Sequence, residues 1–242
     1  MIDEEEVKRW IESQERRKRE EQERKDAVKK EYLLAVAACE NKADDASVHT
    51  AQALREAVEK EEYDTVLSFL DKAVLPGGHT FGIRICEMES GSLGDWSKPF
   101  IRTPDGRRCE SIFEFLRFED SCEGAWHAFL LHQMWHYLPL WWHGNYDRRH
   151  YLYSPDDPPV FEDPLPYFGK KLVMISPDFS RFDLSPEIRT QQGKYYISSC
   201  FWTDFGGLIR EYAVFTLSAG RMEGFYVFDE ETLVEYDCGI CF

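Results

Sequence analysis

Long apolar runs are absent from this sequence, and glycine and proline are absent from its first 75 residues. Without a run of about 18 apolar residues, the chain contains no candidate transmembrane helix. Its first residues, MIDEEEVKRW, provide neither the basic nor the apolar region of a secretory signal peptide. The seven cysteines are odd in number and irregularly spaced, which excludes a fully paired disulfide framework and is typical of free thiols. We therefore expect a soluble, cytoplasmic protein.

Positive charge is scarce outside the N-terminal segment. The formal net charge is −16; residues 1–42 carry 12 acidic and 11 basic side chains, against 33 and 18 in residues 43–242. Because an acidic body repels phosphate backbones and anionic lipids, neither nonspecific nucleic-acid binding nor membrane binding is expected. The charge favours a protein partner that is basic, or a nucleic-acid-binding protein whose ligand the acidic surface mimics. The plain alternative is an acidic protein that is merely soluble.

The N-terminal segment, residues 1–42, is predicted to be one charged helix. Glutamate, arginine and lysine dominate it, and opposite charges recur four residues apart, as in Glu12 with Arg16. Residues 12–26 lack the apolar seam of a coiled coil. The helix is therefore expected to project from the body, or to become ordered on a partner. It should meet the core at residues 32–38, where the composition turns apolar.

Residues 43–153 are predicted to form a mostly helical part with a small β-hairpin. A helical hairpin is expected over residues 44–74, with Ser47 as its N-cap and a stop at Pro76-Gly77-Gly78. The other expected elements are a strand over residues 80–87, two short strands around a turn at residues 103–106, and a short helix over residues 111–118.

An aromatic-rich helix is predicted from about Ser121 to Leu138. Asp120 and Glu123 have the spacing of a capping box, and Pro139 bounds the other end. At 100° per residue, His127 lies at the centre of the apolar stripe, which indicates a hydrogen-bonded core histidine. His132 and His136 fall on the opposite, more polar face together with Gln133.

The segment after this helix is the predicted binding loop. It combines aromatic rings with cationic and amide groups, which recognise phosphates, carboxylates or flat rings. The candidate binding residues are Trp141, Trp142, His143, Asn145, Tyr146, Arg148, Arg149 and His150. Alternatively, the tryptophans anchor an irregular segment to the core while the arginines pair with acidic residues at positions 156–163.

A divalent metal site is a further hypothesis, although no cofactor is expected in the favoured interpretation. His132 and His136, one helical turn apart, can share an ion, and His143 and Asp147 can complete the ligand set. Gln133 stands where a zinc protease motif requires its glutamate base. The alternative is that both helix histidines are half-exposed and hydrogen-bond to loops.

The C-terminal part is predicted to be β-rich. Residues 154–169 form a proline-rich connector, because five prolines within residues 154–166 exclude a continuous helix or central strand. Residues 170–242 contain short apolar runs separated by turns, including one at residues 229–231, and predict an antiparallel meander. Glu211, Ala213, Phe215 and Leu217 alternate with more exposed residue types, so one sheet face should pack on the helices.

These patterns predict an α+β fold in which residues 170–242 and 43–153 form one compact domain. The favoured functional hypothesis is a non-enzymatic, cytoplasmic protein-interaction protein: a complex subunit, an inhibitor or an immunity-like accessory protein. It is based on the acidic body, the charged helix and the lack of a complete catalytic set. The alternative is a metal-dependent hydrolase or nuclease that uses residues 132–150.

Overall fold

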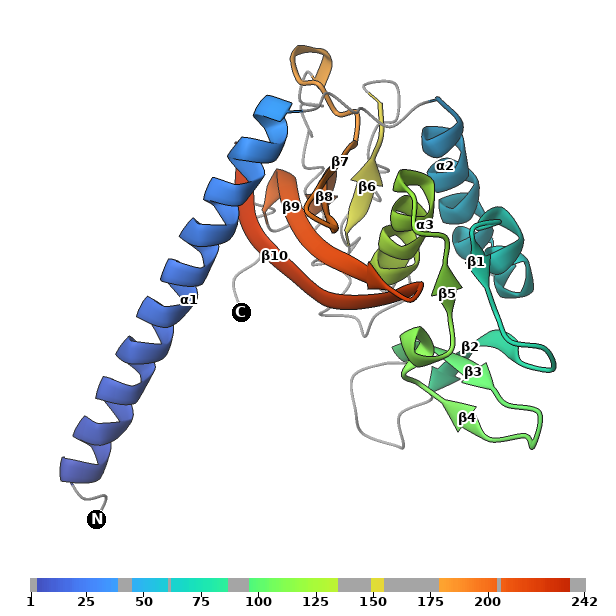
Figure 1. The fold of residues 1–242 in the computed structure, drawn as a ribbon, viewed down its shortest axis with the longest axis horizontal. Coiled ribbons are helices and arrows are strands. Elements are labelled where there is room, and N and C mark those ends of the chain that lie inside the picture. Colours follow the sequence, from blue (N-terminus) through green and yellow to red (C-terminus); the bar gives the residue numbers. More distant parts are fainter. Residues whose placement is uncertain are drawn as a thin grey trace, which may run out of the picture.

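The computed structural model confirms the α+β class. It describes residues 4–38, 45–60, 62–86, 96–134, 149–154, 179–203 and 206–235. Among them are a five-stranded sheet and three α-helices, which are α1 (Glu4–Ala38), α2 (Asp45–Glu59) and α3 (Cys122–Gln133) (Figure 1). The proline-rich connector lies outside these residues except for Ser154, and so do residues 170–178 at the start of the predicted β-rich part.

The large sheet is antiparallel throughout. Its strands run in the order β10-β9-β8-β6, and β7 pairs with the same edge of β8 as β6. The strands are β6 (His150–Leu152), β7 (Glu187–Gln191), β8 (Lys194–Thr203), β9 (Gly207–Ser218) and β10 (Arg221–Val234). The predicted meander is present, but the turn predicted at residues 229–231 is wrong. Asp229 and Glu231 lie within β10, where they pair with Tyr212 and Arg210 of β9. Register shifts on either side of this stretch let the two strands stay paired along its length.

The inner face of the sheet carries the main core. Ala213, Phe215 and Leu217 of β9 point into it, as their alternation predicts, and they pack with buried residues of α2 and α3. Trp126 of α3 is fully buried, and its indole Nε1 donates a hydrogen bond to the Ser47 carbonyl of α2 at 2.9 Å. Ser47 lies within α2, which begins at Asp45, so its predicted role as N-cap is wrong.

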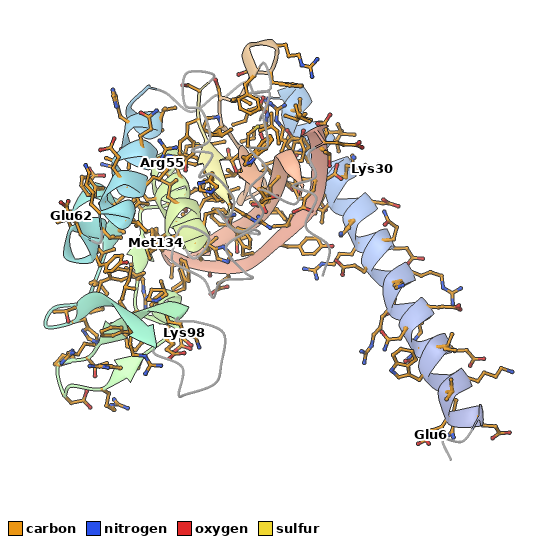
Figure 2. The ribbon with its side chains drawn as sticks, turned by 180° about the vertical axis from the view of Figure 1, so that it is seen from behind. Glu6, Lys30, Arg55, Glu62, Lys98 and Met134 are labelled. Carbon is orange, nitrogen blue, oxygen red and sulfur yellow. The ribbon has the colours of Figure 1, made fainter. Side chains whose placement is uncertain are left out.

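The outer face of the sheet is partly covered by the C-terminal half of α1. Ala35 is buried against Tyr196, Val214 and Phe228, and the Tyr32 ring packs beside them. The rest of α1 leaves the body, as the charged sequence predicts. Figure 2 shows Glu6 at the far end of the projecting helix and Lys30 beside the body.

The start of α3 differs from the prediction by one residue. Ser121, not Asp120, is the N-cap, and its Oγ accepts from the Gly124 backbone N–H at 3.0 Å. Asp120 instead accepts from the Tyr195 hydroxyl at 2.7 Å. Gly124 is required here, since a Cβ atom would lie 2.0 Å from the Glu119 carbonyl oxygen. The helix is described as far as its C-cap, Met134; residues 135–138 lie outside the described part.

Shorter elements connect these layers. The predicted helix over residues 111–118 is wrong, although Leu116 is buried. The helical turn ends early because residues 117–118 pair as a strand and the Phe118 N–H donates to the Gly220 carbonyl at 2.7 Å. Similarly, the second half of the predicted helical hairpin is a 3-10 helix. The elements are η1 (Tyr63–Phe69), β1 (Ala73–Val74), β2 (Thr80–Cys86), β3 (Trp96–Arg102), β4 (Arg108–Cys109), η2 (Ile112–Glu114), β5 (Arg117–Phe118) and η6 (Phe179–Arg181).

Candidate functional site

Four polar side chains form a closed hydrogen-bonded ring on the inner face of the sheet, which we name the polar ring. The Tyr151 hydroxyl donates to Gln133 Oε1 at 2.5 Å, and Gln133 Nε2 donates to Glu211 Oε1 at 2.7 Å. The Arg149 guanidinium forms an ion pair with Glu211 Oε2 and lies 3.5 Å from the Tyr151 hydroxyl. Helix α3, the start of β6 and the middle of β9 each contribute to the ring.

Burial controls the protonation of the polar ring. It raises the pKa of the Glu211 carboxyl, which is 1% exposed, whereas the Arg149 guanidinium acts in the opposite direction. Burial also raises the pKa of Tyr151 well above its usual range. The pKa of Arg149 is lowered by burial, but Tyr151 and Glu211 more than compensate and raise it overall. Tyr151 therefore stays a neutral donor and Arg149 stays charged.

The polar ring holds together the two chain segments that border the predicted binding loop. Gln133 lies just before residues 135–148, and Arg149 follows them directly. Arg149 also stacks over the Phe201 ring at 4.3 Å and lies 3.8 Å from Glu230. Because its guanidinium is engaged on several sides, Arg149 has a structural role in the polar ring, and its role in ligand binding stays a prediction. Gln133, expected on a polar face, is buried for the same reason.

His132 lies between aromatic rings instead of on the polar face that the helical projection indicates. Its imidazole stacks on Phe225 of β10 with the ring centres 3.7 Å apart, and Phe113 is 5.8 Å away. Burial, and then the charge of Arg149, lower its pKa to about 4. Its buried Nδ1 has no hydrogen-bond partner among the described residues. His132 is therefore neutral at pH 7.

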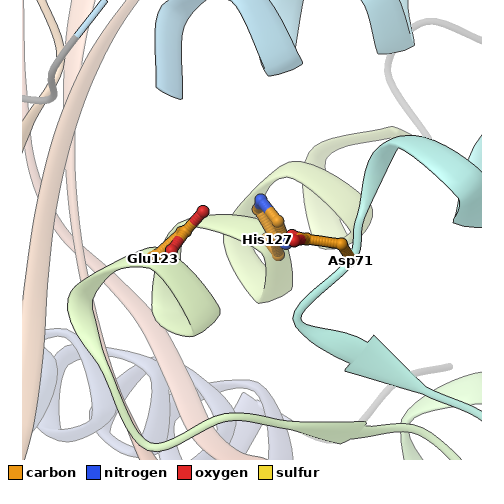
Figure 3. A group of neighbouring side chains, drawn as sticks. All are labelled: Asp71, Glu123 and His127. Atoms are coloured by element: carbon orange, nitrogen blue, oxygen red, sulfur yellow. Dashed lines mark ion pairs between the residues drawn. The ribbon is translucent and has the colours of Figure 1, made fainter. Parts of the chain in front are cut away.

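A second polar cluster surrounds His127 at the start of α3 (Figure 3). Ligand atoms of Asp71, Glu123 and His127 lie within 4.8 Å of one another, which is close enough to share a metal ion. However, the Lys72 ammonium lies 3.2 Å from Asp71 Oδ2 and 3.6 Å from Glu123 Oε2. This cation already pairs with both carboxylates, so a metal ion would have to displace it.

The imidazole of His127 has a structural partner of its own. Its Nδ1 accepts a hydrogen bond from the Lys72 backbone N–H at 3.2 Å, which fixes the turn before β1 onto α3. Burial lowers the pKa of His127, with Asp71 acting in the opposite direction. The prediction of a hydrogen-bonded core histidine is confirmed.

Most of the predicted site residues are not tested by this geometry. His150 begins β6, opposite Trp202 of β8. The remaining predicted binding and metal-ligating residues lie outside the described part of the chain; they are Trp141, Trp142, His143, Asn145, Tyr146, Arg148, His136 and Asp147. Among the described residues of the predicted sets, Arg149 lies near enough to His132 for its charge to lower the pKa of the imidazole.

The outer face of the sheet offers a different kind of site, where α1 lies on the strands. Polar contacts at the edges of α1 hold the helix to the sheet. Glu31 accepts from Lys194 Nζ at 2.6 Å and from the Tyr196 hydroxyl at 3.1 Å, and Lys29 forms an ion pair with Asp229. Open grooves of about 460 and 520 Å³ flank this half of α1. Charged side chains from both sides line them, which does not suit a small apolar ligand.

The N-terminal half of α1 is exposed along nearly its whole length. We name residues 4–20 the free half of α1 and residues 21–38 the docked half, since the contacts with the sheet run from Glu21 to Ala35. Val7, Trp10 and Ile11 in the free half are 41%, 63% and 45% exposed. Their spacing of three and four residues places them together on one side of the helix.

Comparisons with protein-family models, curated proteins and solved structures found no match for this chain. Among the described residues, no helix has both the length and the apolar character needed to cross a membrane. Functional inference therefore depends on the chemistry and exposure of the residues themselves.

Sequence reasoning missed the polar ring and the polar cluster of Asp71, Lys72 and Glu123 around His127. A signal for the first was present, because Glu211 occupies an inward position in the alternation of β9 and a charge at such a position requires a buried partner. The partner itself, Arg149, is 62 residues away in the sequence. For the second, nothing in the sequence places residues 71 and 72 beside α3.

Proposed function

We propose that this chain is a non-enzymatic protein-interaction protein of the cytoplasm, acting as a complex subunit, an inhibitor or an accessory protein. The observation that carries the proposal is the free half of α1, which presents a tryptophan that is 63% exposed beside two other exposed apolar residues. Tryptophan and large aliphatic side chains contribute strongly to protein interfaces when a partner covers them. The free half of α1 is therefore the proposed contact element.

Two further observations support this proposal. Cys109 and Cys200 are free thiols, which suits a reducing compartment. The acidic body suits a basic protein partner, and four acidic residues of β10 and its C-terminal end are exposed, namely Glu223, Glu230, Glu231 and Glu235.

A binding experiment with matched variants tests the proposal. The immobilised full-length chain is compared with a variant carrying Val7→Ser, Trp10→Ser and Ile11→Ser. A control carries Leu33→Ser and Leu34→Ser, which removes apolar area that is 58% and 57% exposed at the docked end of the same helix. We expect the specific partner to be lost only from the first variant. Identical retention by all three proteins would refute the role of the free half.

The metal-dependent hydrolase remains the alternative prediction. Elemental analysis of protein purified without chelator tests it, with His132→Ala as the comparison. A stoichiometric transition metal that disappears in this variant would favour the enzyme over the interaction protein. At the His127 cluster, the position of the Lys72 ammonium argues against a bound cation.

A further inference from the structure

The small sheet β2–β3–β4 has one face against the core and one face towards solvent. Phe81 and Ile83 of β2 and Ile101 of β3 pack on the main core, so the residues that alternate with them point outward. Figure 1 shows this sheet on the side of the body away from α1. The outward face carries four cations and one carboxylate, namely Arg84, Lys98, Arg102, Arg108 and Glu110. It is therefore locally basic in a chain whose net charge is −16.

The described strands of this sheet and the turn between β3 and β4 contain two carboxylates, and both are paired. Glu110 lies 2.9 Å from the Lys98 ammonium through Oε2 and 3.5 Å from the Arg84 guanidinium through Oε1. Asp105 lies 2.7 Å from Arg107 Nε in the turn. These carboxylates are therefore committed to other cations than the remaining two arginines.

The remaining two, Arg102 and Arg108, stand directly opposite each other across β3 and β4, and both are exposed. Within the described part of the chain, neither has a carboxylate at ion-pair distance. Side chains at opposite positions have Cβ atoms about 4.5–5.5 Å apart, so the two like charges repel each other. The Arg108 guanidinium lies over the Phe100 ring at 5.2 Å, which leaves its N–H groups directed away from the ring. The two guanidinium groups can thus converge on one anion.

An aromatic groove adjoins this arginine pair. Its volume is about 480 Å³, and its walls include Tyr63, Thr80, Gly82, Phe100 and Arg102. Gly82 lets the Phe100 ring lie across β2, since a Cβ atom there would be 2.9 Å from the ring. The volume is in the range of sites for small ligands. A groove with an aromatic wall and a cation at one end suits a flat ring that carries an anionic group.

We propose that this face binds a phosphotyrosine side chain of a partner protein, with the phosphoryl group on Arg102 and Arg108 and the phenyl ring in the groove beside Phe100. A phosphoryl group carries a charge of about −1.5 to −2 near pH 7 and matches two guanidinium groups, whereas a carboxylate carries only one charge. A long polyanion such as a nucleic acid would be repelled by the acidic remainder of the chain. The inference goes beyond the proposed function, because it adds a contact surface that does not depend on the free half of α1.

Isothermal titration calorimetry of the full-length chain at low salt tests the proposal. The probe is a short alanine–serine peptide that carries one phosphotyrosine, and the comparison peptides carry tyrosine, phosphoserine or glutamate at the same position. We expect the phosphotyrosine peptide to bind at least about tenfold more tightly than each of the others. The affinity should fall as salt is added, because exposed charges are screened.

Charge-matched variants locate the site. Arg102→Gln with Arg108→Gln should weaken binding of the phosphotyrosine peptide by at least about tenfold. Arg17→Gln with Lys18→Gln removes the same charge from exposed positions in the free half of α1, and it should leave the affinity unchanged. The first variant should also keep the melting temperature of the wild type, since it removes a repulsion and no ion pair. Thermal denaturation checks that it is folded.

Several results would overturn the phosphotyrosine site. They are equal binding of the phosphotyrosine and tyrosine peptides, equal binding of the phosphoserine or glutamate peptide, and an equal loss of affinity in both charge variants. Tighter binding of single-stranded oligothymidylate than of the phosphopeptide would replace the peptide by nucleic acid. The variant with Val7→Ser, Trp10→Ser and Ile11→Ser should bind the phosphopeptide like the wild type, so this inference and the proposed function can fail separately.

Discussion

The two faces of the five-stranded sheet are covered in different ways. On the inner face, α3 and the neighbouring elements bury a continuous apolar core, and the polar atoms of Gln133 and Glu211 are satisfied by the polar ring. On the outer face, half of one helix packs on aromatic rings of the sheet and is held at its edges by half-exposed ion pairs such as Lys29 with Asp229. The difference indicates that the inner face contributes most of the stability, while the outer face holds only the docked half of α1.

Removing the carboxylate of the polar ring should have the largest effect. We expect Glu211→Ala to lower the free energy of unfolding by about 3–5 kcal/mol, because it leaves the Arg149 guanidinium and the Gln133 amide without their acceptor. Urea denaturation measures this. Glu230→Ala is the matched control; Glu230 also lies near Arg149 but is 50% exposed, so it should cost less than about 1 kcal/mol. Equal effects would contradict a structural role for the buried ring.

Acid should weaken the inner face through His132. The pKa of this group falls from 6.5 to about 4 on folding, so the folded state favours the neutral ring. The resulting stability is fully present above pH 6.5 and is lost as the pH falls towards 4, by roughly 3 kcal/mol.

The measurement is urea unfolding at pH 7.5 and pH 4 for the wild type and for His132→Phe. The variant keeps an aromatic ring on Phe225 but cannot titrate, so its stability should fall less than that of the wild type between the two values. A fall of the same size in both proteins would show that other groups carry the pH dependence.

The smallest expected effect lies on the outer face. Tyr32→Ala removes ring contacts with Tyr196, Tyr212 and Phe228, at centroid distances of 5.5–6.0 Å. It should cost about 1–2 kcal/mol. Hydrogen exchange should show the docked half of α1 losing protection while β8 and β9 keep theirs. Leu34→Ala, at an exposed position, should change stability by no more than about 0.5 kcal/mol. Joint loss of protection in α1 and the inner strands would mean that the two faces are not independent.

Local patterns predicted the elements whose environment repeats along the chain. Residue type and the period at which apolar residues recur along the sequence predict three of these parts. They are the charged helix, the β2–β3–β4 region and the C-terminal hairpins. Prediction failed where a distant contact overrides the local signal. The acidic residues at positions 229–231 indicate a turn, yet pairing with β9 and the ion pair from Lys29 keep them in one strand.

The candidate site was predictable only in part, for the same reason. The i,i+4 spacing of His132 and His136 is visible in the sequence, but the Phe225 ring that covers His132 comes from a strand more than ninety residues later. The same holds for Arg149. Its ion-pair partner Glu211 comes from β9, and the Phe201 ring on which it stacks comes from β8.

By itself, the sequence determined the α+β class, the acidic body and a long helix too polar to be buried, because composition and period are properties of the chain alone. The tertiary structure decided which half of α1 is docked and which is free, since only the aromatic outer face of the sheet selects residues 21–35. It also decided that Arg149 and Glu211 meet, because an ion pair between distant residues forms only once the strands between them are placed.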